Sequence, residues 1–180
     1  MSVIDLNDPK MFRIDTSGRS IGYFCKTNPV CVDADLLNAL KRQAQQITDK
    51  DIRLCLHSTP EALFHDMIIL TRKGRYQTPH KHNEKAESWH IIEGVMGVFV
   101  FDQAGKVIQA SRLESGGGIV YRIDPGFYHA VMPMSDIVLF HESRPGPYRG
   151  TDSLPAPWAP NNEDLQGLRR FYETLQRLLP

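Results

Sequence analysis

Residues 74–94 read GRYQTPHKHNEKAESWHIIEG and contain His80-Lys81-His82, with Glu87 following shortly afterwards. Because side chains alternate sides along an extended strand, His80 and His82 share one face and lie about 6–7 Å apart at their Cα atoms. Both imidazoles can therefore reach one ion at about 2.0–2.2 Å, and Glu87 can join them once the chain turns back. The spacing predicts a metal site.

Residues around the histidine pair strengthen this interpretation. A His-x-His pair also occurs on surface strands, where both rings are merely solvated. Here Gly74 and Gly94 bracket the segment, and Pro79 restricts the approach to the first histidine. Glycines at both ends of a β-rich segment mark turns that bring strands back over one another. The pattern therefore favours a metal site over solvated histidines.

A fourth ligand is expected from residues 117–129, which read GGIVYRIDPGFYH. The β-branched and aromatic run at 119–123 predicts a strand, and Asp124-Pro125-Gly126 predicts a tight turn. His129 opens the next apolar run, so its side chain should point at a fixed position. The alternative is an ordinary half-buried histidine.

These residues resemble the two conserved motifs of the cupin family. The first cupin motif corresponds to Gly74-x5-His80-x-His82-x4-Glu87-x6-Gly94. The two glycines and the histidine of the second motif correspond to Gly118, Gly126 and His129. The chain departs from the family at Asp124, where a proline is usual, and at Pro133, where an asparagine is usual; neither position binds the metal. The resemblance implies that one divalent metal is bound inside a small β-barrel by His80, His82, Glu87 and His129.

The chain also resembles the WbuC-type cupin metalloproteins, which are found among bacterial O-antigen and surface-polysaccharide genes. Besides the histidine motif, this resemblance is carried by the segments RLCLH at 53–57, HDMII at 65–69, GPY at 146–148 and APWAP at 156–160. It covers roughly residues 20–160. It implies a fold and a metal, but no settled reaction.

Between residues 53 and 142, short strand-forming runs alternate with breaks at glycine and aspartate. This regular spacing is typical of a closed barrel or jelly roll. The predicted fold is mainly β, a cupin-type β-barrel (jelly roll) with an N-terminal helix and a C-terminal helix packed outside. We expect one domain over residues 1–180, with a barrel core at 53–142, an N-terminal extension at 1–52 and a Pro-rich cover and helix at 143–180.

The two expected helices cover residues 36–46 and 163–179, where apolar residues recur at helical spacing. Each follows a capping residue, either Asp33 or Asp35 for the first helix and either Asn161 or Asn162 for the second. The apolar stripe of the second helix should pack on the outside of the barrel. A homodimer contact is the alternative.

Three further residues are candidates for catalysis. Arg53 and His57 share a face of the strand-like segment 53–57, so an inward-facing Arg53 can bind an anionic group bidentately and His57 can move a proton. Tyr76 has the parity of His80 along an extended chain, which predicts that it faces the metal as an acid or base. The alternatives are a surface ion pair for Arg53, a satisfied histidine for His57 and barrel core for Tyr76.

Composition narrows the partners and the setting. The chain has 180 residues, 41% hydrophobic content and a formal net charge of zero, so no basic surface is expected to hold nucleic acid. Neither a signal peptide nor a membrane span is expected from the sequence. Three irregularly spaced cysteines, Cys25, Cys31 and Cys55, predict reduced thiols and a cytoplasmic location. The expected partner is a small-molecule ligand or substrate.

Three imidazoles and one carboxylate bind divalent Fe, Mn, Ni, Zn or Co, so the ligand types leave the identity of the metal open. Four protein ligands leave one or two coordination positions for a substrate or for oxygen. Three functions are therefore considered. The first is a metal-dependent enzyme, such as an isomerase or lyase, acting on a small polar substrate; the resemblance implies that this substrate is carbohydrate-derived and belongs to bacterial surface-polysaccharide metabolism. The second is an Fe(II)-dependent dioxygenase, and the third is a non-catalytic, metal-anchored binding protein.

Overall fold

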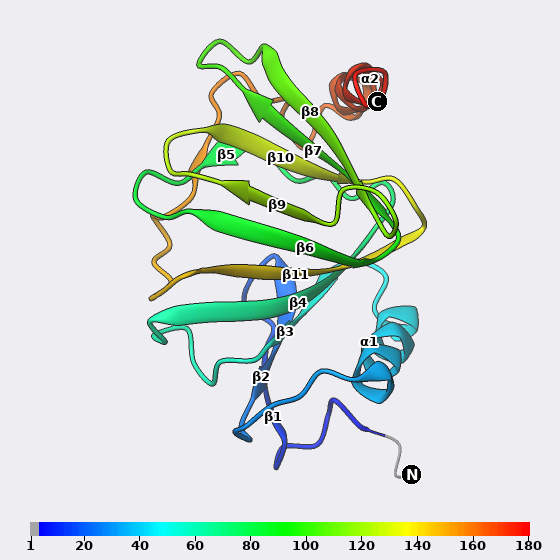
Figure 1. The fold of residues 1–180 in the computed structure, drawn as a ribbon, viewed down its shortest axis with the longest axis vertical. Coiled ribbons are helices and arrows are strands. Elements are labelled where there is room, and N and C mark those ends of the chain that lie inside the picture. Colours follow the sequence, from blue (N-terminus) through cyan, green and yellow to red (C-terminus); the bar gives the residue numbers. More distant parts are fainter. Residues whose placement is uncertain (1–3) are drawn as a thin grey trace.

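The short apolar runs of the chain pair into two β-sheets (Figure 1). The computed structural model describes residues 4–180. The first sheet has the order β1 (Phe12–Asp15), β2 (Ser20–Cys25), β3 (Asp51–Cys55), β4 (Phe64–Arg72), β11 (Ile137–Pro145), β6 (Glu87–Glu93) and β9 (Val120–Ile123). The second has the order β12 (Leu154–Pro155), β5 (His80–Lys81), β10 (Tyr128–Pro133), β7 (Val95–Phe101) and β8 (Val107–Glu114). Only β2 and β3 run parallel among these paired strands.

The two sheets face each other across an apolar layer. Trp89 and Phe140 of the first sheet share one buried cluster with Val98 and Val131 of the second. Because strand side chains alternate between faces, the same strands also present an outer face that must be covered or solvated. The inner layer therefore joins the sheets into a sandwich, and each outer face needs a cover of its own.

Helix α1 (Ala34–Gln46) covers the outer face of the first sheet. Leu36 and Leu40 are buried on it against Ile52 and Leu54 of β3. The helix begins after Asp33, whose Oδ1 accepts a hydrogen bond of 2.9 Å from the backbone N–H of Leu36. Of the two predicted capping residues, Asp33 is therefore the one that caps. The helix also forms part of the connection that parallel strands β2 and β3 require.

Helix α2 (Leu165–Gln176) covers the outer face of the second sheet, where Leu175 is buried beside Phe99 and Phe101. The predicted bounds of 163–179 and the predicted caps at Asn161 or Asn162 were wrong. Asp164 caps the helix instead, because its Oδ1 accepts a hydrogen bond of 2.8 Å from the backbone N–H of Gly167. The predicted apolar stripe is only partly buried, since Leu165 is 76% exposed.

The fold prediction is confirmed in its main features. The protein is mainly β, with two sheets forming a cupin-like sandwich and one helix on the outside of each sheet. The N-terminal region contributes β1 and β2 to the first sheet, which extends that sheet on the side of β3. No helix within residues 4–180 is both long enough and apolar enough to cross a membrane.

Candidate metal centre

The four predicted metal ligands come together between the two sheets. His80 lies on β5 and pairs in register with His129 of β10, so two neighbouring strands of the second sheet bring these rings together. His82 follows β5 directly, and Glu87 begins β6 of the first sheet. One nitrogen from each histidine and one carboxylate oxygen of Glu87 all lie within 4.8 Å of one another.

Each histidine of the cluster is oriented by a backbone carbonyl. Nδ1 of His80 lies 3.0 Å from the carbonyl oxygen of Thr78, and Nδ1 of His82 lies 2.8 Å from that of Asp152. Nδ1 of His129 lies 3.0 Å from the carbonyl oxygen of Phe127. A carbonyl can only accept, so in each contact Nδ1 must be the donor and carry a proton. A neutral ring then has a lone pair on Nε2, which is the form that binds a metal. The backbone therefore prepares all three rings as ligands.

The contacts with Glu87 show why this cluster suits a cation. Nε2 of His82 lies 3.0 Å from Glu87 Oε1, and Nε2 of His129 lies 3.2 Å from Glu87 Oε2. Both Nε2 atoms are buried, and neither has a partner in hydrogen-bonding geometry. With Nδ1 protonated, a lone pair on each neutral ring meets a carboxylate lone pair, which is unfavourable unless a proton or a metal ion lies between them. Three nitrogens and one oxygen fit a divalent transition metal.

The charges of the cluster agree with this interpretation. Burial raises the pKa of Glu87, but the adjacent His129 and His82 rings and the Arg144 guanidinium outweigh burial and hold its pKa well below the usual range. Burial and the neighbouring His129 lower the pKa of His80 to about 4. At neutral pH the site therefore offers a carboxylate and at least one neutral imidazole. Burial opposes a charge on His82, yet Glu87 raises its pKa, so a proton competes with metal at this ring.

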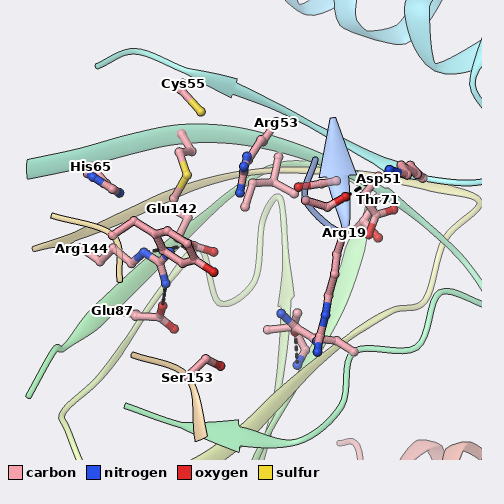
Figure 2. A pocket seen from close by; sticks show the side chains of 18 of the residues that line it. Arg19, Asp51, Arg53, Cys55, His65, Thr71, Glu87, Glu142, Arg144 and Ser153 are labelled. Carbon is pink, nitrogen blue, oxygen red and sulfur yellow. Dashed lines mark hydrogen bonds and ion pairs between the residues drawn. The ribbon is translucent and has the colours of Figure 1, made fainter. Parts of the chain in front are cut away.

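Two charged residues of β11 complete the surroundings of Glu87, and the sequence analysis did not identify them. Arg144 Nη1 donates to Glu87 Oε1 over 3.0 Å, and Arg144 Nε lies 3.8 Å from Glu142 Oε1 (Figure 2). Burial and the nearby Glu87 raise the pKa of Glu142. Strand alternation could have revealed both charged residues. Phe140, Glu142 and Arg144 are every second residue of one strand and therefore share a face, so the two charged side chains follow Phe140 on the inner side of the sheet.

A cavity of about 650 Å³ opens beside the cluster, and its lining includes His80, His82 and Glu87. Pockets of this size accommodate small organic molecules. The three predicted catalytic residues, Arg53, His57 and Tyr76, all line the same cavity. The three residues therefore lie on the wall of the cavity beside the metal cluster, and the ring of Tyr76 also packs against Phe171 and Tyr172 of α2.

His57 and Tyr76 differ in how they are held. The His57 ring stacks on His65 with the ring centroids 4.1 Å apart, and burial together with the charge of His65 lowers the pKa of His57 to about 4. The Tyr76 hydroxyl donates to the Pro160 carbonyl over 3.3 Å, and burial raises its pKa to about 12. At neutral pH His57 is therefore uncharged and Tyr76 keeps its proton.

Comparisons with known proteins leave the chemistry of the site open. The model of a family described as a domain of unknown function, DUF6016, matches residues 32–113, which include His80, His82 and Glu87 but not His129. A search of curated proteins found no match.

Among solved structures, oxalate decarboxylase from Bacillus subtilis is 15% identical with a TM-score of 0.47, over 58% of this chain and 27% of the decarboxylase chain. A structural-genomics protein from Shewanella oneidensis is 14% identical with a TM-score of 0.47, over 67% of this chain and 77% of its own. Procruciferin, an 11S globulin from Brassica napus, is 13% identical with a TM-score of 0.41, over 51% of this chain and 22% of the globulin chain. The chain thus spans about a quarter of the decarboxylase and globulin chains. With TM-scores below 0.5 and identities of 13–15%, these matches carry no argument about the chemistry of this chain.

Proposed function

We propose that the chain binds one divalent metal ion at His80, His82, Glu87 and His129 and acts on a small polar substrate in the adjoining cavity. The observation that carries the proposal is the pair of buried, unpartnered Nε2 atoms facing Glu87. A divalent metal bound there would supply Lewis-acid polarisation of a substrate oxygen. The cavity supplies the space for such a substrate beside the ligands.

The residues of the chain have separate tasks in this proposal. Arg144 holds Glu87 through its hydrogen bond to Oε1 and so keeps the carboxylate directed at the imidazoles. His57 and Tyr76 line the cavity and are our candidates for moving a proton to or from the substrate. The carbohydrate origin of the substrate, the finer resemblance to WbuC-type proteins and a homodimer remain predictions from the sequence.

Metal analysis tests the proposal directly. Protein purified without added metal, and protein reconstituted after chelation with Fe, Mn, Ni, Zn or Co, should each contain close to one metal ion per chain by elemental analysis. His82→Ala should lose the metal while the far-ultraviolet circular dichroism remains native. His90→Ala is the matched control, because His90 lies on β6 with an exposed side chain. A wild-type chain that takes up no divalent metal after reconstitution would contradict the proposal.

Oxygen uptake by the iron-loaded protein separates the remaining functions. An oxygen-consuming reaction with a small polar substrate would select the dioxygenase, whereas turnover without oxygen consumption would select Lewis-acid chemistry. Metal-dependent ligand binding without any turnover would select the non-catalytic binding protein. In the two enzymatic cases, His80→Ala should abolish turnover while the fold persists.

A further inference from the structure

The end of the cavity on the side of β1 to β3 contains an arginine that the metal cluster does not use. Arg53 lies on β3, in register with Gly22 of β2 and Ile69 of β4. Ile69 packs against the inner apolar cluster, so Arg53 faces the interior of the sandwich rather than solvent. Figure 2 shows the Arg53 side chain extending from the sheet into the cavity.

Arg53 is not satisfied by the protein. Its Nε is buried and has no hydrogen-bond partner, and no ion pair involving its guanidinium is found within residues 4–180. A buried guanidinium donor without an acceptor costs free energy, so a protein that needed only a core residue would be more stable with an apolar side chain at this position. The arrangement therefore suits a residue that awaits an acceptor from outside the chain.

The backbone around Arg53 leaves room for its guanidinium. A Cβ atom at Gly22 would lie 3.1 Å from Arg53 Nε, and one at Gly18 would lie 3.6 Å from Arg53 Nη2. Gly22 therefore allows the arginine side chain to pass close to β2. The turn at Gly18 is itself held in place, because Lys50 Nζ donates to the carbonyls of Thr16 (2.9 Å) and Gly18 (3.1 Å).

The other charged groups at this end include two carboxylates and a second arginine. Asp15 Oδ1 accepts hydrogen bonds from the backbone N–H of Ser17 (2.9 Å) and from its hydroxyl (2.6 Å). Asp51 Oδ1 lies 3.8 Å from Arg75 Nε and is buried without a hydrogen-bond partner. Arg19, whose side chain is exposed, also lines the cavity, and in Figure 2 its guanidinium lies apart from that of Arg53. Within residues 4–180 neither guanidinium forms an ion pair with a carboxylate, although the hydrogen bonds from Ser17 and, to a lesser degree, the charge of Arg53 lower the pKa of Asp15.

We infer that Arg53, together with Arg19, binds an oxyanion of the substrate, a carboxylate or a phosphate, at the end of the cavity remote from the metal cluster. This inference rests on the proposed function, because it places the rest of the same substrate at the metal site. The substrate class is then a small acid that carries an oxygen donor at one end and an anionic group at the other. A guanidinium presents two parallel N–H groups to such an anion, which lysine cannot do.

Titration of the metal-free protein tests the arginine site on its own. The probes are inorganic phosphate and the dicarboxylate glutarate. Their binding to the full-length chain, treated with chelator and dialysed, is measured by isothermal titration calorimetry. Arg53→Met should weaken binding about 10- to 100-fold, because it removes charge-assisted hydrogen bonds but keeps an apolar stem. The affinity of Arg53→Lys for the probes should lie between that of the wild type and that of Arg53→Met. Arg112→Met is the control, since Arg112 pairs with Glu114 outside the cavity and should leave binding unchanged.

Thermal stability separates a binding role from a structural one. Arg53→Met should melt at or above the temperature of the wild-type chain, and phosphate should raise the melting temperature of the wild type but not of the variant. If Arg53→Met fails to fold, Arg53 is structural, and the inference then stands only if Arg53→Lys and Arg19→Met both weaken phosphate binding. Equal binding by the wild type and Arg53→Met, or no binding of either probe by the wild type, would overturn it.

Metal content distinguishes this inference from the function on which it rests. Arg53→Met should retain the same metal content as the wild type by elemental analysis. A chain that binds phosphate through Arg53 but takes up no metal would contradict the metal proposal alone. A chain that takes up metal but binds both probes independently of Arg53 would contradict the anion site alone.

Discussion

Replacing Arg144 with methionine should destabilise the metal-free protein strongly and should make its stability depend on added metal. The guanidinium lies 3.0 Å from Glu87 and 3.8 Å from Glu142, and all three side chains are largely buried, with 15%, 4% and 13% exposure respectively. Removing one partner of a buried ion pair typically costs about 3–5 kcal/mol, because the other charge stays buried without compensation. Glu142 can take up a proton, so we expect the lower end of that range.

The expected loss can be measured by thermal denaturation in the presence of a chelator. A loss of about 3 kcal/mol corresponds to a melting temperature lower by about 6–12 °C for a chain of this size. Adding a divalent metal should raise the melting temperature of Arg144→Met by more than that of the wild type, because the cation replaces the missing positive charge beside Glu87. Arg144→Lys is the matched control and should lose less, since it keeps the charge.

The pH dependence has a definite sign. Burial and Glu87 already raise the pKa of Glu142 above the unfolded value, and removing the Arg144 charge should raise it further. The folded variant then binds more protons than the unfolded chain, so its stability falls relative to the wild type as the pH rises. The deficit should be larger at pH 8 than at pH 5. A variant that melts within about 2 °C of the metal-free wild type at both pH values would refute the argument.

Two further predictions concern the cavity wall and the outer core. Burial lowers the pKa of His57 to about 4, so as the pH falls from 6.5 to 4 the unfolded chain takes up a proton before the folded chain does. The free energy of unfolding of the wild type should therefore fall by about 1–2 kcal/mol over this range, allowing for the partial exposure of the ring. Urea denaturation should show a smaller fall in His57→Phe, and an equal fall would contradict the assignment. Leu40→Ala should lower the free energy of unfolding in urea by about 2–5 kcal/mol, because Leu40 of α1 is completely buried against the outer face of the first sheet. It should not change the metal content. Leu165→Ala, at a position 76% exposed, is its control, and a loss below about 1 kcal/mol for Leu40→Ala would count against the packing.

The residues of the candidate metal centre could be predicted from the sequence because most of them are close together in the chain. His80, His82 and Glu87 fall within one short segment, where strand parity and a single turn are enough to bring side chains together. The strands could be predicted for a related reason, since β-branched and aromatic runs between glycines are a local signal. The start of α2 was harder to predict from the sequence, because Asp164 and the two preceding asparagines are all acceptable capping residues.

Contacts between distant segments were harder to predict. Arg144 lies far from Glu87 in the chain and reaches it only because β11 pairs with β6. The role of the backbone was hidden as well: Asp152 accepts from the His82 ring with its carbonyl, which any residue type could provide. Pairing between strands, rather than residue type, determines both contacts.

The sequence by itself therefore determined the mainly β class and the histidines and glutamate of the site, because periodicity and short spacings act within one segment. Only the tertiary structure decided which way the imidazoles face, what surrounds Glu87 and where Arg53 points. Those features depend on the register of strands that are distant in the chain, and a shift of one residue would turn every side chain to the other face. The tertiary structure thus turned a histidine motif into a cavity with the candidate metal centre at one end and the Arg53 guanidinium at the other.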